Sequence, residues 1–300
     1  MTQKFLALAQ SGKNQWWRYL FGIIIILVSW QGIGSIPFIS LVFLLQNDKI
    51  PETKINPQTL QLEGGAPLLL YLVINFSFVC FLISLYIAVR FIHQRDFITL
   101  ITPNNKVNWY RVIQGFGIWI FILAVSSMID YYFISPGNYK LTFDISNFLI
   151  FLPIALILTS IQASVEELFF RGYLMQGIGL TTRNASISIL VASFLFMLLH
   201  LLNPEVKSGF IPLAYYYFFS AIFLSIITVK DNSLELAIGT HIGNNMFRAF
   251  FVNYTNSVLP SPSIFTMQKL NPTSNLINTL VCFMLFYLFF FRKSRRTISN

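Results

Sequence analysis

Long apolar segments separated by short polar ones dominate the chain. Eight of them approach 20 residues, the length with which a helix crosses the hydrocarbon core of a bilayer. They lie at about Tyr19–Leu45, Ala66–Ile92, Trp109–Ile134, Phe148–Leu180, Ala185–Leu202, Phe210–Val229, Ser233–Val252 and Ser274–Phe291. The pattern predicts an all-α fold, a polytopic membrane helix bundle of about eight transmembrane helices. Gly32, Gly34 and Pro37 predict a kink or an early end in the first helix.

Composition supports an integral membrane protein. The chain is 55% hydrophobic and 10% charged, whereas a soluble domain has roughly 25% charged residues. The net charge of +9 does not indicate a nucleic-acid partner, because no basic run is interleaved with a soluble fold. Cys80 and Cys282 each lie in an apolar run, so neither a disulfide framework nor a thiolate zinc site is expected.

The distribution of basic residues predicts the orientation. With the N-terminus inside, most Lys and Arg residues between the helices fall on the inner side, which is the usual bias of cytoplasmic loops. We therefore expect a cytoplasmic tail at 1–18, a transmembrane domain at 19–291 and a basic cytoplasmic tail at 292–300. Asn47–Gly65 and Asn253–Asn275 are expected to be outer loops.

One charged stretch interrupts the fourth apolar segment. Glu166, Glu167 and Arg171 lie inside it, although a charge at the bilayer centre costs about 2.5–3.5 kcal/mol on insertion scales. Glu167 and Arg171 are four residues apart, so on a helix they share a face and can pair. Glu166 points about 100° away and lacks that partner. The spacing thus predicts one neutralised acid and one available acid.

Two histidines lie within other apolar helices. Phe196 and His200 share one helix face, and His241 shares a face with Asn245. Ionisable residues inside a membrane usually face the bundle interior or a watery cavity. At 1.5 Å per residue, Glu166 lies about 21 Å from the inner end of its helix, and His200 and His241 lie about 24 and 14 Å from theirs. Three helices could therefore place these groups around one cavity, which we expect to open toward the cytoplasm.

This set of side chains allows two kinds of hydrolytic site. A carboxylate in a partly dry cavity can act as a general base on water, while imidazole and amide N–H groups stabilise an oxyanion. Alternatively, Glu166, His200 and His241 could hold Zn²⁺ with an open fourth position. Buried His and Asn can also simply bond one helix to another, and the Glu–Arg pair can be structural.

The three motifs together resemble those of a known family. EExxxR at Glu166–Arg171, FxxxH at Phe196–His200 and HxxxN at His241–Asn245 occur in this order within about 145–250. This is similar to the CAAX prenyl endopeptidase and bacteriocin-processing family (CPBP, or Abi) of intramembrane proteases, whose eukaryotic member is the Ras-converting enzyme Rce1. The N-terminal half shows no match beyond hydrophobicity.

The resemblance implies an eight-helix bundle with a catalytic core at about 145–250. It implies that Glu166 activates water, that His200 and Asn245 position this water or hold the oxyanion, and that His241 lines the site. Glu167, Arg171 and Phe196 match supporting positions. The family was long described as metalloproteases. We favour a glutamate mechanism without a cofactor, because the chain has no HExxH motif and Glu166 is better kept free as the base; zinc on Glu166, His200 and His241 is the alternative.

The expected function is therefore endopeptidase cleavage of a membrane-associated peptide or protein; prenylated and leader-type peptides are two candidate classes, and no feature of the sequence names the substrate. The expected location is the plasma membrane of a bacterium. Two other classes stay open: a non-catalytic immunity or scaffold protein of the same fold, and a proton-coupled transporter. The transporter would favour paired broken helices and an inverted repeat, and the sequence shows neither.

Overall fold

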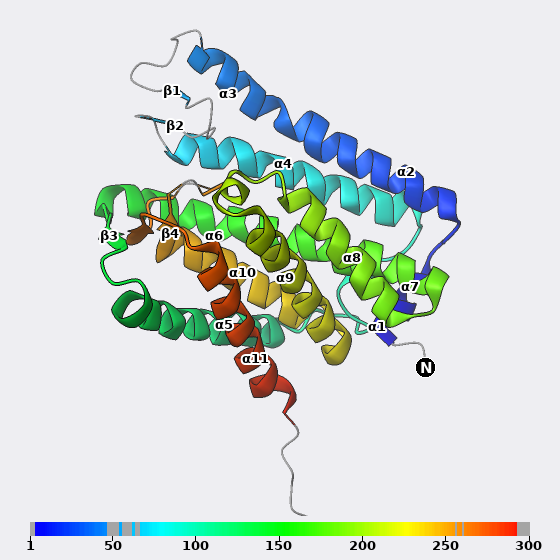
Figure 1. Cartoon of the computed structure of the whole chain (residues 1–300). Helices are drawn as coiled ribbons and strands as arrows, with labels where there is room; N and C mark the ends of the chain where they lie inside the picture. Colours follow the sequence, from blue (N-terminus) through cyan, green and yellow to red (C-terminus); the bar gives the residue numbers. More distant parts are fainter. Residues whose placement is uncertain are drawn as a thin grey trace, which may run out of the picture.

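The protein is described by a computed structural model over residues 4–46, 54–55, 62–63, 67–255, 257–259 and 261–292. Figure 1 shows a bundle of helices with a few short strands, which confirms the predicted all-α bundle. Large apolar side chains cover much of its outer surface. Such a surface suits a bundle that lipid rather than water surrounds.

All eight predicted apolar segments are helical in the structure. Six helices in the described part of the chain are long and apolar enough to cross a membrane: Trp16–Leu45, Leu68–Ile92, Trp109–Ile134, Ile145–Thr182, Phe210–Asp231 and Pro272–Phe291. The fifth segment forms the shorter apolar helix α8, Ala185–His200. The seventh forms α10, Glu235–Phe250, which is polar at several positions and mostly buried inside the bundle.

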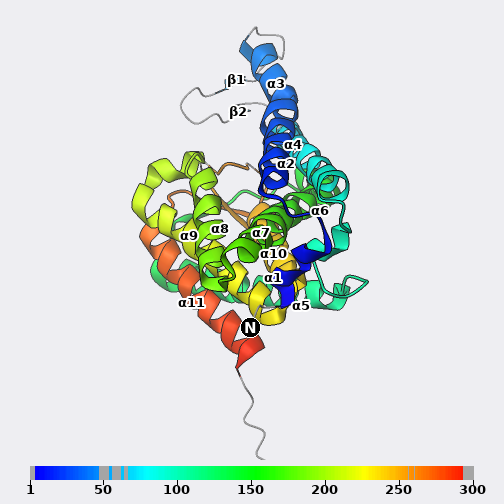
Figure 2. The same ribbon diagram turned by 90° about the vertical axis from the view of Figure 1, so that its right-hand side faces the viewer.

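The first segment changes its helical geometry close to Gly32 and Gly34, where the sequence predicts a kink or an early end. It consists of α2 Trp16–Leu27, a π-helical turn Val28–Gly32, a 3-10 turn Ile33–Ser35 and α3 Ile36–Gln46. These pieces run beside α4, Pro67–Ile87, along one edge of the bundle (Figures 1 and 2). A Cβ atom at Gly34 would lie 2.7 Å from the Cα atom of Ser77 in α4. The glycine therefore permits the close approach of the two helices.

The fourth segment is one continuous helix with a wider stretch inside it. Its parts are α6 Ile145–Glu167, the π-helical stretch η7 Leu168–Met175 and α7 Gln176–Thr182. Every residue of η7 is buried. π-Helical turns are frequent at functional sites, and Glu166 and Glu167 lie immediately before this one.

Three further long helices complete the bundle: α5 Trp109–Ile129, α9 Phe210–Asp231 and α11 Pro272–Phe291. Side-chain oxygens of Asn108, Asp144, Asn184 and Asn271 accept backbone N–H groups at the starts of α5, α6, α8 and α11. Such caps satisfy donors that have no partner within the helix.

The strands are short. β3 Tyr139–Leu141 and β4 Val252–Tyr254 flank β5 Phe265–Met267, antiparallel and parallel to it respectively. The second predicted outer loop is therefore partly strand. In the first, β1 Lys54–Ile55 pairs antiparallel with β2 Leu62–Glu63, and the rest of Asn47–Gly65 lies outside the described residues.

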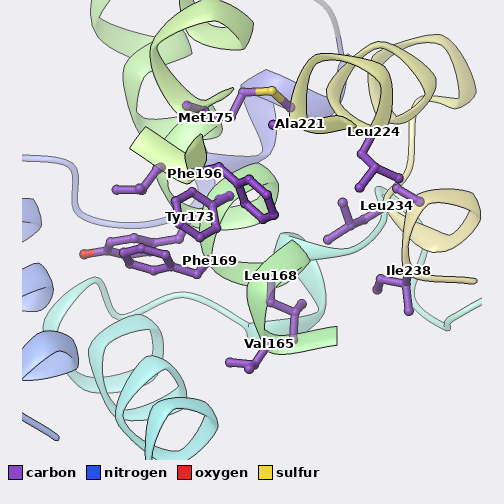
Figure 3. Packing of buried hydrophobic residues seen from close by; sticks show 14 of the residues in the cluster. Val165, Leu168, Phe169, Tyr173, Met175, Phe196, Ala221, Leu224, Leu234 and Ile238 are labelled. Atoms are coloured by element: carbon purple, nitrogen blue, oxygen red, sulfur yellow. The ribbon is translucent and has the colours of Figure 1, made fainter. Parts of the chain in front are cut away.

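The largest apolar core surrounds η7. Figure 3 shows Phe169 and Tyr173 of this stretch near Phe196 of α8, with Ala221 and Leu224 of α9 nearby. Residues of η7 therefore touch helices that are distant in the sequence. This packing holds the end of α6, and with it Glu166 and Glu167, in the interior.

The segments predicted to be inner share one end of the bundle. α1, Lys4–Ala7, lies beside α7 (Figures 1 and 2), and the Phe5 backbone N–H donates to Asn232 Oδ1 at 2.9 Å. His93 is buried there, with Nδ1 2.8 Å from the Lys13 carbonyl and Nε2 2.8 Å from the Tyr173 hydroxyl. Burial lowers the pKa of His93. Residues 4–11 of the predicted tail are therefore packed against the bundle, and residues 293–300 lie outside the described residues.

α10 packs most extensively against α5. A Cβ atom at Gly115 of α5 would lie 2.5 Å from the Leu236 carbonyl oxygen, and one at Gly239 of α10 would lie 2.0 Å from the Val112 carbonyl oxygen. Small residues at such crossings let two backbones approach closely. Because α10 carries His241 and Asn245, this contact sets the position of part of the predicted site.

Gly115→Ala is expected to destabilise the protein by about 1–3 kcal/mol, since the new methyl group would press against the backbone of α10. Gly117 is the matched control, because a Cβ atom there would have open space within 4 Å. Thermal unfolding in detergent measures both variants. Equal melting temperatures for Gly115→Ala and Gly117→Ala would show that this crossing tolerates separation.

The orientation can be tested by cysteine labelling in a variant that lacks Cys80 and Cys282. Asn105 and Ser208 are exposed at opposite ends of the bundle. The bias of basic residues predicts that a membrane-impermeant thiol reagent labels Asn105→Cys only from the cytoplasmic side and Ser208→Cys only from the outer side. The reverse pattern would overturn the predicted topology.

Candidate active site

A cavity of about 560 Å³ lies inside the bundle. Glu166 of α6, His200 of α8, and His241 and Asn245 of α10 all line it, so the structure brings together the four residues that the motifs select. Pockets of this size with a few polar groups are typical of sites for small ligands or peptide segments.

Glu167 lies behind the cavity in a buried ionic cluster. Its Oε1 atom accepts a hydrogen bond from Arg171 Nη1 at 2.8 Å and another from His241 Nδ1 at 2.7 Å. Both Glu167 and Arg171 are almost fully buried. The pairing predicted from the spacing of Glu167 and Arg171 is therefore present, and His241 joins it as a second partner.

Arg171 is anchored on several sides. Its Nη2 donates to the Ala221 carbonyl at 3.0 Å and its Nε to Ser225 Oγ at 3.3 Å, both in α9. Its guanidinium carbon lies 4.9 Å from the centre of the Phe196 ring. The same arginine thus joins α6, α8 and α9 around one carboxylate.

Glu166 has different surroundings. It is 5% exposed and lines the cavity. Its Oε2 lies 3.8 Å from Nε2 of His200 and 3.8 Å from Nε2 of His241, beyond hydrogen-bond distance. Within the described residues, no side chain neutralises Glu166 as Arg171 neutralises Glu167.

The hydrogen bonds of the two histidines fix their tautomers when they are neutral. His200 Nδ1 lies 2.8 Å from the Phe196 carbonyl, which can only accept, and His241 Nδ1 lies 2.7 Å from the Glu167 carboxylate. Each Nδ1 therefore carries the proton. Each Nε2 then has a lone pair facing Glu166. In this form the histidines can accept a hydrogen bond from water, whereas holding an oxyanion would need a further proton on Nε2.

Phe196 and Asn245 also line the cavity. The Phe196 ring stacks on His200 with centroids 4.1 Å apart, so the two share a face as predicted. Asn245 Oδ1 accepts from Asn244 Nδ2 at 3.1 Å. This bond uses the oxygen of Asn245 and leaves its amide N–H groups as the neutral donors next to the histidines.

The candidate zinc ligands do not form a metal site as they stand. Tetrahedral zinc with ligands at about 2.0–2.1 Å brings ligand atoms to roughly 3.3 Å from one another. Both Nε2 atoms are 3.8 Å from Glu166 Oε2. In the part of the chain that the structure describes, no group of three His, Cys, Asp or Glu side chains is arranged to hold a metal ion.

The position of the cavity bears on two predictions, the orientation of the chain and the side on which the cavity opens. Asn203, Glu205 and Tyr254 line it, and they belong to segments that the basic residues place outside. The predicted orientation and the predicted cytoplasmic opening are therefore incompatible for this cavity. The depth estimate already points the same way: Glu166 lies about 24 Å from Thr182, the inner end of α7, and is therefore nearer the outer side of the membrane.

Several polar residues of the cavity were not part of the predicted site, and three of them stand out. Glu205, Tyr217 and Arg248 line it, and the Tyr217 hydroxyl donates to Glu205 Oε1 at 2.7 Å. Arg248 had a signal in the sequence, because it lies seven residues after His241 and so on the same face of an apolar helix. Glu205 follows α8 in a loop and had no such signal.

Comparison with known proteins gives an independent view of the chain. Residues 146–247 match a model of the type II CAAX prenyl endopeptidase Rce1-like family. The chain is 34% identical over 297 residues to the uncharacterized protein YyaK of Bacillus subtilis (strain 168). The alignment covers 95% of this chain and 95% of YyaK. No solved structure matches it.

The matched region begins at the start of α6 and ends in α10. It thus contains all of Glu166, Glu167, Arg171, Phe196, His200, His241 and Asn245. This chain is an integral membrane protein with long apolar helices. It belongs to the Rce1-like family of CAAX-type intramembrane proteases.

Proposed function

We propose that the protein is an intramembrane endopeptidase that cleaves a membrane-associated peptide or protein, with Glu166 as the general base. The main observation in support is that two adjacent glutamates have different contacts. Glu167 is held by Arg171 and His241, while Glu166 faces the cavity and two imidazole nitrogens.

The first step is the attack of water on the scissile carbonyl carbon. The Glu166 carboxylate takes one proton of the water, and Nε2 of His200 or His241 accepts a hydrogen bond from the other. Because both Nε2 atoms lie 3.8 Å from Glu166 Oε2, one water oxygen can lie within about 2.8 Å of the carboxylate and of an imidazole. The histidines thus position the water, and Glu166 activates it.

The tetrahedral intermediate then carries a negative oxygen. The amide N–H of Asn245 donates to it, in a cavity whose low polarity strengthens such a bond. The C–N bond breaks, and the proton held on Glu166 moves to the departing nitrogen. The products are a carboxylic acid and an amine, and Glu166 returns to its starting state.

The substrate is placed at the membrane because the bundle that encloses the cavity is itself apolar on its outside. A prenylated or leader-type peptide would enter with its lipid or apolar part in the bilayer. The relative from a bacterium supports a location in a bacterial plasma membrane. No cofactor takes part in the proposed mechanism.

Glu166→Gln is expected to reduce cleavage by about 10²–10⁴-fold, the usual contribution of a general base, and to leave the melting temperature nearly unchanged. Glu167→Gln is the matched control with the same chemical change one residue away. It leaves Arg171 without its carboxylate and should lower stability by about 3–5 kcal/mol. Turnover retained in Glu166→Gln would overturn the role of Glu166.

The substrate for this measurement comes from trapping. The Glu166→Gln protein is purified from membranes, and its bound peptides are identified by mass spectrometry. The identified peptides are then incubated with the unsubstituted protein. A peptide held by the variant and cut by the unsubstituted protein is the expected result. A biological effect that persists in both Glu166→Gln and His200→Ala would instead favour the non-catalytic immunity or scaffold protein.

The glutamate mechanism also predicts insensitivity to metal removal. Cleavage should continue after exhaustive chelation, and elemental analysis of the active protein should find zinc well below one ion per chain. Loss of cleavage that added Zn²⁺ restores would contradict the mechanism and favour the ligand set Glu166, His200 and His241.

A further inference from the structure

Gln162 is a polar residue of α6 that the proposed mechanism does not use. It lies one turn before Glu166 and lines the same cavity. It is only 8% exposed, and its side-chain oxygen is buried without a hydrogen-bond partner among the described residues. A buried amide in this state is costly, because on folding it gives up its hydrogen bonds to water. Such a group is suited to bond a molecule that enters the cavity.

Thr159 provides a contrast on the same side of α6. It also lines the cavity, but its hydroxyl is hydrogen-bonded to the hydroxyl of Tyr71 in α4. This bond joins two helices, so the fold itself explains the polar group at Thr159. For the oxygen of Gln162, the part of the chain that the structure describes offers no equivalent partner.

Helices form the cavity wall around Glu166. Glu166, His200 and Asn245 belong to α6, α8 and α10, and the backbone N–H and C=O groups within a helix are bonded to one another. A peptide that reaches Glu166 leaves water and brings a backbone N–H and C=O with almost every residue. Side chains must therefore supply partners for these groups. A primary amide suits this task, because it accepts through its oxygen and donates through its nitrogen.

The spacing on α6 relates Gln162 to the reaction. Residues four apart share a helix face and lie about 6 Å apart along the helix axis. An extended peptide advances about 3.3–3.6 Å per residue. A backbone group bound at Gln162 is therefore within about two residues of a peptide bond that lies beside Glu166.

We propose that Gln162 binds the backbone of the substrate peptide within about two residues of the scissile bond. This role rests on the proposed protease function. The side-chain oxygen accepts a backbone N–H and the side-chain nitrogen donates to a backbone carbonyl, and a half-turn of the amide group exchanges the two atoms. Because nearly every residue carries both backbone groups, Gln162 contributes to peptide affinity without selecting a particular side chain.

The test uses two probes that differ only in their backbone. One is N-palmitoylated hexa-alanine with a C-terminal amide, and in the other lactate replaces each alanine after the first, so that esters replace the backbone amides. Binding to the full-length Glu166→Gln protein in lipid nanodiscs is the reference, since this substitution prevents cleavage. We expect the reference to prefer the amide probe. Adding Gln162→Met, which keeps the side-chain length without the amide, should reduce this preference about three- to tenfold, the effect of one hydrogen bond.

Two further variants separate binding from folding. Thr159→Val removes a hydroxyl from the same wall but leaves Gln162 in place, so the preference should stay as in the reference. Gln162→Glu keeps an oxygen acceptor and should retain more of the preference than Gln162→Met. The melting temperature in detergent should fall in Thr159→Val, which loses the bond to Tyr71. It should not fall in Gln162→Met, where the lost oxygen has no partner within the described protein.

Equal binding of the two probes to the reference, a preference that Gln162→Met leaves unchanged, or an equal loss in Thr159→Val would overturn the proposal. A lower melting temperature in Gln162→Met would also overturn it, because the amide would then have a structural role. Cleavage of the amide probe by the protein without substitutions is followed in parallel. A preference that depends on Gln162 without any cleavage would count against the protease and not against the backbone contact. Cleavage together with a preference that does not depend on Gln162 would keep the protease and remove the contact.

Discussion

The buried carboxylate of Glu167, shared between Arg171 and His241, is the interaction on which the rest of the site depends. It joins α6 to α10 directly and, through Arg171, to α9. Loss of Arg171 would leave the charge of Glu167 uncompensated in an apolar interior and would lower stability by about 3–5 kcal/mol. The shared carboxylate also sets the tautomer of His241 and so directs a lone pair of that histidine toward Glu166. Two residues of the same type thereby have different surroundings: Glu167 joins the helices, and Glu166 faces the cavity in which we propose that the substrate binds.

The surrounding bundle makes this division possible. η7 is buried on all sides, and the glycine contact between α5 and α10 brings the backbone of α10 close enough for its polar face to line a cavity. The apolar parts of the wall lower the local polarity and so strengthen the polar contacts beside them. Beyond the reacting groups, Arg248 extends the polar wall toward the loops at one end. The cavity is thus polar where Glu166, His200 and one face of α10 meet, while apolar side chains line much of the rest of its wall.

The sequence predicts much of this arrangement because its signals are local or periodic. Apolar run lengths predict the helices within a few residues, and the four-residue spacing of Glu167 and Arg171 predicts their pairing. What the sequence could not predict depends on contacts between distant segments. The bond of His241 to Glu167 requires the crossing of α6 and α10, and the burial of residues 4–11 requires docking on α7. The side toward which the cavity opens depends on loop segments such as that of Glu205, which carry no periodic signal.

In the proposed reaction, water attacks the scissile peptide bond beside Glu166. The most direct measurement is an experimental structure of the Glu166→Gln protein with an uncleaved peptide bound. We expect the scissile carbonyl carbon to lie beside the side chain at position 166 and its oxygen to lie within about 3 Å of Asn245 Nδ2. A peptide bound with every carbonyl away from position 166, or a metal ion bridging His200 and His241, would contradict it.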